Sequence, residues 1–180
     1  DFGSGTGTTG SAGRMNKRDI GIFGSGGGHP GRTQVVSAGT TTGPTIRVRD
    51  GYLRGFILAD LEVGNTDTAD ANRAQPCIDL ETVDSATTLT ANSNDEWATL
   101  RNVRVDGGGS ATAALVLTGT TMLRTYGLEL AACTYGIVLR GSSANYPDNL
   151  HFEDTVFHDN VTADILTSVG NEGVWAFSIN

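Results

Sequence analysis

A chain of 180 residues is long enough for one domain with a continuous core, and a formal net charge of −8 excludes the basic face that nucleic-acid binding requires. Lysine occurs only as Lys17, and Lys and Arg together number 12 against 20 Asp and Glu. No apolar run approaches the roughly 20 residues of a membrane-spanning helix. We therefore expect no nucleic-acid partner and no membrane insertion.

The first 18 residues, which include "DFGSGTGTTGSAG", are rich in Gly, Ser and Thr, and we expect a flexible N-terminal segment there. The predicted domain covers residues 19–180. Because the chain begins at Asp1 rather than at Met, we expect a processed chain or a piece of a longer protein.

A glycine-rich stretch from Gly26 to Thr33, "GGGHPGRT", nearly matches the phosphate-binding pattern G-x-x-x-x-G-K-[ST], with Arg32 in the place of lysine. Such a loop binds phosphate because it opens a helix whose amides face the ligand. The residues that follow, "QVVSAGTTTGPTIRV", are poor helix formers, and Pro30 removes an amide donor from the loop itself. We therefore predict that the loop binds no nucleotide.

Short runs of alternating apolar residues recur along the chain, whereas no stretch shows a sustained period of 3.6 residues. They form two interleaved sets of predicted strands. The first set comprises Ile46–Val48, Ile78–Leu80, Leu115–Leu117, Ile137–Leu139 and a weaker copy near Ile165. The second set comprises Leu61–Val63, Val103–Val105, Leu128–Leu130, Thr155–Phe157 and Phe177–Ile179. The Gly, Asn, Asp and Ser clusters between them are typical of turns.

Successive members of the second set begin 42, 25, 27 and 22 residues apart, which is typical of a solenoid with two or three short strands per repeat. A sandwich or barrel would also have many short strands, but signals for tight hairpins are scarce. We predict an all-β fold, a right-handed parallel β-helix of about five or six coils with no significant helix. The longest interval is expected to be one coil with an insertion.

Stacked coils place equivalent residues about 4.8 Å apart, so the register predicts columns of outward side chains. The three predicted columns are Arg47–Asp79–Val116–Val138, Arg49–Glu81–Thr118–Arg140 and Glu62–Arg104–Glu129–Val156. Adjacent charges within each column are opposite in sign, which parallel stacking favours.

Asp79 and Glu81 share one face of a predicted strand, at a spacing that also suits the two carboxylates of a glycosidase. In the predicted columns, however, Arg47 and Arg49 stand beside them. Pairing with arginine lowers a carboxyl pKa, which is the wrong direction for a general acid. We therefore interpret these residues as a charge ladder and not as a catalytic pair.

The sequence "HFEDTVFHDN" contains residue types that ligate metals, namely His151, Glu153, Asp154, His158 and Asp159. On a strand, His151 and Glu153 share one face while Asp154 and His158 share the other. We expect a solvated rim at a turn, no metal site and no cofactor.

An aromatic residue beside carboxylates is a suitable sugar-binding group, because the ring packs on a sugar face while the acids accept hydroxyl hydrogens. The candidates are Asp95, Glu96 and Trp97 at the end of "TANSNDEW", with Tyr146 in "SSANYPDN" as a second. The structural alternative for Trp97 is an inward ring that starts the next strand.

Cys77 and Cys133 lie 56 residues apart, without CxxC or histidine spacing. The pattern favours two small buried thiols, with a disulfide as the alternative.

Three stretches resemble the pectate-lyase-like β-helix superfamily, and within it the phage tailspikes: "DIGIFGSGGGHPGRTQVV", "GPTIRVRDGYLRGFILADLEVGN" and "FEDTVFHDN". The shared features are a G-x-G turn at Gly24 and Gly26, a following strand at 33–36, "GIVLRG" at 136–141 and "VFHDN" at 156–160. These motifs describe coil geometry and cover about residues 19–180. The glycines before Thr33 are thereby interpreted as a turn between strands.

The resemblance implies a homotrimer that binds, and in some members cleaves, bacterial surface polysaccharide. It also implies association with other virion proteins, a virion location in the tail rather than on the capsid, and synthesis in the bacterial cytoplasm. The pattern also leads us to expect an anchor domain before Asp1 and a cap after "WAFSIN", and the 180 residues contain neither. We expect either a fragment or caps from a partner subunit.

Three functions remain open at this point. The first is a tailspike or tail-fibre protein that binds host surface polysaccharide as a receptor. The second is a capsid decoration or other structural virion protein, and the third is a polysaccharide lyase, hydrolase or epimerase. The lyase and hydrolase members carry Arg, Lys or paired acids on one groove, and no such set matches here residue by residue.

Overall fold

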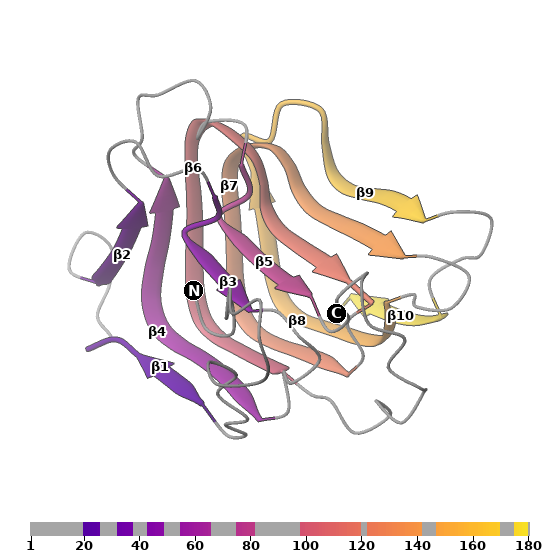
Figure 1. Ribbon diagram of the computed structural model, residues 1–180, viewed down its shortest axis with the longest axis horizontal. Coiled ribbons are helices and arrows are strands. Elements are labelled where there is room, and N and C mark those ends of the chain that lie inside the picture. Colours follow the sequence, from indigo (N-terminus) through magenta and orange to yellow (C-terminus); the bar gives the residue numbers. More distant parts are fainter. Residues whose placement is uncertain are drawn as a thin grey trace, which may run out of the picture.

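The computed structural model describes residues 20–25, 32–37, 43–48, 55–65, 75–81, 98–119, 122–141, 147–169 and 175–179. These residues form ten strands and no helix, and the strands make one sheet that is curled into a half-barrel (Figure 1). This part of the chain therefore contains no helix that could cross a membrane. The N-terminal segment, residues 1–18, lies outside the described residues.

Every strand pairing in the sheet is parallel. The main path through the sheet is β1-β4-β6-β7-β8-β10, while β2 pairs with β4, β3 with β5, β5 with β6, and β9 with β7. The strands are β1 (Gly21–Phe23), β2 (Thr33–Ser37), β3 (Ile46–Val48), β4 (Phe56–Asn65), β5 (Ile78–Glu81), β6 (Ala98–Thr118), β7 (Leu123–Gly141), β8 (Asp148–His158), β9 (Ala163–Val169) and β10 (Trp175–Ile179). The all-β, parallel part of the predicted fold is confirmed.

Both predicted sets of strands exist, and most members stack as expected. Val103–Val105 pairs with Leu61–Val63 on one side and with Leu128–Leu130 on the other. One assignment was wrong: Phe177–Ile179 pairs with Leu150–Phe152 of β8 and not with Thr155–Phe157. It belongs to a third set of strand segments, which also includes Phe56–Leu58, Ala98–Leu100 and Leu123–Thr125.

The third set escaped notice because one left-handed residue, rather than a turn of several residues, separates it from the second set. Asp60, Asn102, Gly127 and Asp154 occupy equivalent positions, have φ between 50° and 65°, and are skipped in the strand register. Asparagine, aspartate and glycine tolerate this region best. The bend resets the inward–outward alternation, so that Leu58 and Leu61, three residues apart, are both fully buried.

Hydrogen bonds reinforce this corner on the polar side. Asn102 Nδ2 donates to Asp60 Oδ1 at 3.1 Å, and the Arg101 guanidinium donates to Asp60 Oδ2, also at 3.1 Å. On the other side, Arg32 Nη2 donates to Asn102 Oδ1 at 2.9 Å. The bond from Asn102, followed by that from Arg101, lowers the pKa of Asp60, which opposes its desolvation. The corner therefore loses support as the pH falls through that lowered pKa.

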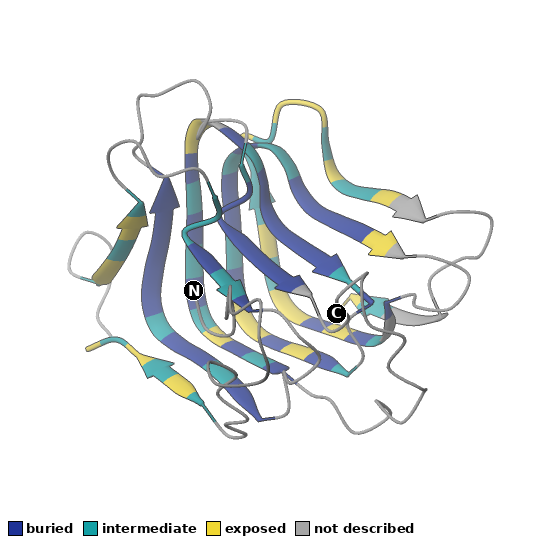
Figure 2. Cartoon of the chain, in the orientation of Figure 1, coloured by how far each residue is buried: buried dark blue, intermediate teal, exposed yellow. Residues whose placement is uncertain are grey.

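The core lies on one face of the curled sheet, where apolar side chains of successive strands stack on one another. Figure 2 shows buried residues along most of β4, β6 and β7, while β1 and β2 are more exposed. Cys77 and Cys133 belong to this core, and both are buried and free, as the sequence favoured. The hydrogen bond of the Cys77 thiol to Cys133, followed by burial, raises the pKa of Cys77.

Replacement of Asn102 tests the contribution of the left-handed corner. Asn102→Ala removes the side-chain hydrogen bonds but keeps a Cβ, in a backbone region that costs about 1–2 kcal/mol for an ordinary residue. Asn102→Gly removes the same hydrogen bonds without that backbone cost, as Gly127 does at the equivalent position. We expect the alanine variant to be less stable than the glycine variant by about 1 kcal/mol in urea unfolding. Equal stability of the two variants would contradict the role of the backbone conformation.

Candidate functional site

The predicted sugar-binding residues Asp95, Glu96, Trp97 and Tyr146 lie outside the described residues. Of the glycine-rich loop, Arg32 and Thr33 are described. Arg32 donates to the Asn102 side chain, so its guanidinium takes part in the corner described above. Thr33 begins β2 and its hydroxyl accepts the Ser25 amide hydrogen at 2.9 Å, which ties the two ends of the loop together.

The first and third predicted columns are confirmed in register, and so is the second from Glu81 onward. Arg47 pairs with Asp79, Asp79 with Val116 and Val116 with Val138, while Glu81 pairs with Thr118 and Thr118 with Arg140. Arg49 lies outside the described residues. Arg47 Nε and Asp79 Oδ2 are 3.2 Å apart, so the Asp79 carboxylate has a cationic partner. Val116 and Val138 differ from the expected outward exposure, because both are buried in a second apolar cluster with Ala113.

The third ladder places Arg104 among carboxylates. Its guanidinium nitrogens lie 3.9 Å from Glu62, 3.4 Å from Glu129 and 3.1 Å from Asp106. Glu62 also accepts a hydrogen bond from Gln34 at 3.0 Å, which extends the ladder to β2. These contacts hold adjacent strands in register and leave the ladder acids engaged with partners.

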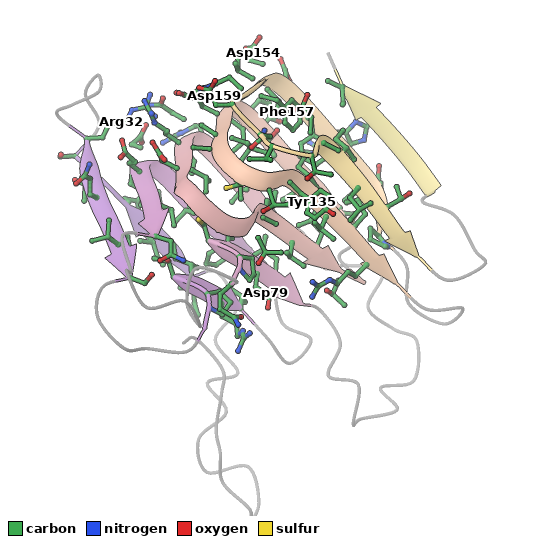
Figure 3. The ribbon with its side chains drawn as sticks, turned by 90° about the horizontal axis from the view of Figure 1, so that it is seen from above. Arg32, Asp79, Tyr135, Asp154, Phe157 and Asp159 are labelled. Carbon is green, nitrogen blue, oxygen red and sulfur yellow. The ribbon has the colours of Figure 1, made fainter. Side chains whose placement is uncertain are left out.

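The cluster of potential metal ligands divides among separate places. His151 and Glu153 are exposed on the first segment of β8, at the two-residue spacing that the sequence predicted. Asp154 sits at the left-handed corner, which interrupts the alternation expected to put it on one strand face with His158; His158 ends β8, and Asp159 follows directly after the strand. Figure 3 shows Asp154 and Asp159 on the side of the molecule opposite Asp79. Among the described residues, no group of three or more His, Cys, Asp or Glu side chains could hold a metal ion.

His158 bridges two carboxylates. Its Nδ1 lies 2.9 Å from Asp159 Oδ2, and its Nε2 lies 2.9 Å from Glu129 Oε1. The bond to Asp159, followed by the bond to Glu129, raises the pKa of His158 above its ordinary value of 6.5. The bridge therefore stabilises the fold fully below pH 6.5, and this contribution is lost as the pH rises through the raised pKa.

Three neighbouring strands, β7, β8 and β10, form a polar depression. A cavity of about 210 Å³ is lined by Arg124, Tyr126, His151, Phe152, Glu153 and Ser178. Arg124 pairs in register with His151, and His151 with Ser178, while Tyr126 pairs with Glu153. Apart from Phe152, each strand thus contributes one or two side chains, at the two-residue spacing of a strand face.

Three of these side chains are available to a ligand. Within the part of the chain that the structure describes, the side chains of Arg124, Tyr126 and Glu153 make no hydrogen bond or ion pair with another residue. The Tyr126 side chain is exposed, with 39% of its surface accessible. The pocket therefore presents one aromatic ring, one guanidinium and one carboxylate to solvent.

Both ring nitrogens of His151 are engaged within the same pocket. Nδ1 lies 2.8 Å from Ser178 Oγ, and Nε2 lies 2.9 Å from Asn149 Oδ1. These bonds fix the plane of the imidazole against β10 and orient it without any contact to the acidic bridge around His158.

Sequence reasoning singled out two of the six residues that line this pocket. It placed His151 and Glu153 on one exposed face, but it did not identify "LRTY" at 123–126 as a strand, so Arg124 and Tyr126 were missed. The signal that could have found this strand is the alternation of two residues that are now buried, Leu123 and Thr125, with the exposed Arg124 and Tyr126. Comparisons with protein-family models, with curated proteins and with solved structures found no match.

The His158 bridge gives a pH-dependent prediction. Replacing His158 by Gln removes the titrating group, so the variant should lack the part of the stability that falls as the pH rises above 6.5. The difference in free energy of unfolding between wild type and variant should shrink as the pH is raised from about 5.5 to about 9 in urea titrations. A difference that is constant or grows with pH would contradict the bridging role.

Proposed function

We propose that this protein binds carbohydrate through the pocket formed by Arg124, Tyr126, His151, Glu153 and Ser178. The observation that carries the proposal is the exposed Tyr126 ring beside Arg124 and Glu153, which have no partner within the described residues. Aromatic rings pack against the apolar face of a sugar. Guanidinium and carboxylate groups donate to and accept from its hydroxyls.

The dimensions of the pocket fit a short contact with a polymer. At about 210 Å³, the cavity is smaller than the roughly 300–1,000 Å³ of typical small-molecule sites. Such a cavity holds about one sugar unit, and a single site of that size binds weakly. Several copies on one assembly would raise the avidity for a repetitive polysaccharide by roughly 10² or more.

The proposal extends to the complete fold and to the biological role. We infer that the half-barrel is the described part of a right-handed parallel β-helix, and that the protein is a phage virion component of the tailspike or tail-fibre type. In this role it binds host surface polysaccharide as a homotrimer. Support comes from the parallel strands, the three repeated segments and the register of the ladders, together with the resemblance in the coil motifs.

Replacement of Tyr126 tests carbohydrate binding. Tyr126→Ala should weaken binding to the best ligand on an array of bacterial surface polysaccharides by about tenfold or more, or about 1.4 kcal/mol, because the stacking ring is lost. The exposed aromatic Phe23 lies on β1, outside the pocket, so Phe23→Ala is the matched control and should bind normally. If no polysaccharide binds the wild type, or if both variants bind like wild type, the pocket is not the carbohydrate site.

A further inference from the structure

Ser178, His151 and Asn149 form a connected chain of side chains at the edge of the pocket. Ser178 Oγ lies 2.8 Å from His151 Nδ1, and His151 Nε2 lies 2.9 Å from Asn149 Oδ1. Ser178 belongs to β10, and the other two belong to β8, which is its neighbour in the sheet (Figure 1). The serine and histidine face the pocket.

The hydrogen-bond partners fix the tautomer of His151. An amide oxygen can only accept, so Nε2 carries the hydrogen that is donated to Asn149 Oδ1. In the neutral imidazole, Nδ1 then has a free lone pair that accepts the Ser178 hydroxyl hydrogen. The ring is thereby ready to take a proton from the serine, which is the function of a general base.

We propose that Ser178 is a nucleophile, His151 its general base and Asn149 the positioning residue, and that this group hydrolyses a short acyl ester on the bound carbohydrate. Only the sugar part of this substrate rests on the proposed carbohydrate binding, and the catalytic roles of the three side chains do not depend on it. The mutual geometry meets the requirement for an activated hydroxyl, namely a base within hydrogen-bond reach that a third group orients.

Asn149 is held in an unusual conformation that suits a positioning role. Its φ of 51° lies in the left-handed region, directly before the strand segment that carries His151. Asparagine tolerates this region better than most residues. The bend turns the Asn149 side chain back to the imidazole two residues later, so the backbone geometry and the hydrogen bond support each other.

Arg124 supplies a cation that stabilises the negative charge formed during ester hydrolysis. It pairs in register with His151, lines the same cavity and has no partner among the described residues. The tetrahedral intermediate of acyl transfer carries an oxyanion, and a guanidinium close to the attacked carbonyl stabilises that charge. His151 has Arg124 beside it on β7 and Ser178 beside it on β10, so the cation and the nucleophile lie on either side of the base.

The reaction follows from these positions. Ser178 Oγ attacks the ester carbonyl carbon, its proton passes to His151 Nδ1, and the oxyanion forms beside Arg124. The intermediate collapses when the bond from the carbonyl carbon to the sugar oxygen breaks, and His151 protonates the departing sugar hydroxyl. Water, deprotonated by His151, then attacks the acyl-serine, and the carboxylic acid leaves as Ser178 recovers its proton. The net change is ester plus water to sugar hydroxyl plus carboxylic acid.

The size of the pocket selects the acyl group. A cavity of about 210 Å³ that also receives a sugar unit on Tyr126 has room for a short acyl chain such as acetyl, and not for a long fatty chain. The surroundings are polar, with Arg124 and Glu153 exposed to water, which disfavours a lipid ester.

The test uses two probes that need no sugar. A fluorophosphonate should form a phosphorus–oxygen bond with Ser178, with loss of fluoride, and peptide mapping by mass spectrometry should find the label on that residue. Hydrolysis of p-nitrophenyl acetate should fall by roughly 10²–10⁴-fold in Ser178→Ala and in His151→Gln. Asn149→Ala should reduce the rate and shift its pH profile, because the tautomer is no longer fixed, whereas Asn149→Asp should restore most of the activity.

Matched controls lie elsewhere on the sheet. Ser37 donates to Asn65 Oδ1 at 3.1 Å, and His158 bridges two carboxylates, so each resembles its counterpart but lies outside the pocket. Ser37→Ala and His158→Gln should keep wild-type labelling and hydrolysis. The label map on the wild type gives an answer even where a variant fails to fold.

The outcomes separate this inference from the binding proposal. Absence of label on Ser178 together with absence of ester hydrolysis, in a wild type that binds polysaccharide, overturns the catalytic assignment and leaves carbohydrate binding intact. Labelled Ser178 in a protein that binds no polysaccharide supports the hydrolase and overturns the sugar part of the substrate. Release of acetate from an acetylated polysaccharide, lost in Ser178→Ala but with binding retained, supports both.

Discussion

The in-register parallel pairing of strands is the constraint on which the rest of this structure depends. Parallel neighbours repeat every 4.8 Å or so, and each residue therefore meets the equivalent residue of the next repeat. Leu58, Leu100 and Phe152 follow one another on the core side because of this register, with Thr125 between the last two. A slip by one residue would reverse the two faces of a strand, so the buried apolar column fixes the polar column as well.

The left-handed corners extend this constraint from single strands to the curled sheet. One residue with positive φ bends the chain between two strand segments without a loop, and the next repeat bends at the equivalent place. The Asn102 side chain donates to the Asp60 side chain across neighbouring strands, so the corner residues also form a column of stacked, interacting positions. The bend keeps apolar side chains directed at one common core from segments that face different directions, which allows a chain of short strands to bury a continuous interior.

The same regularity explains why a polar pocket forms without any dedicated loop. The pocket side chains occupy neighbouring register positions on three adjacent strands: Arg124 and Tyr126 on β7, His151 and Glu153 on β8, and Ser178 on β10. A rigid sheet holds such side chains at spacings that stay fixed as substrates bind, which is the property that both sugar recognition and acyl transfer need. The charge ladders of Asp79 and Arg104 use the equivalent outward positions elsewhere for stability, since their carboxylates and guanidinium groups are paired.

The sequence by itself determined the strand character, the parallel order and two of the three ladders as far as described, because alternation and repeat spacing are local patterns. It predicted the pairing of Arg47 with Asp79 and of Glu62 with Arg104, since opposite charges recur at equivalent positions. It did not find the segment at 123–126 or the true partner of Phe177, because the single-residue corners at Gly127 and Asp154 break the alternation without a recognisable turn motif. Only the tertiary structure brought Ser178 to His151, which are 27 residues apart in the chain. Their contact depends on the pairing of β10 with β8 in this register, and that pairing is decided by the packing of the whole sheet rather than by any local sequence.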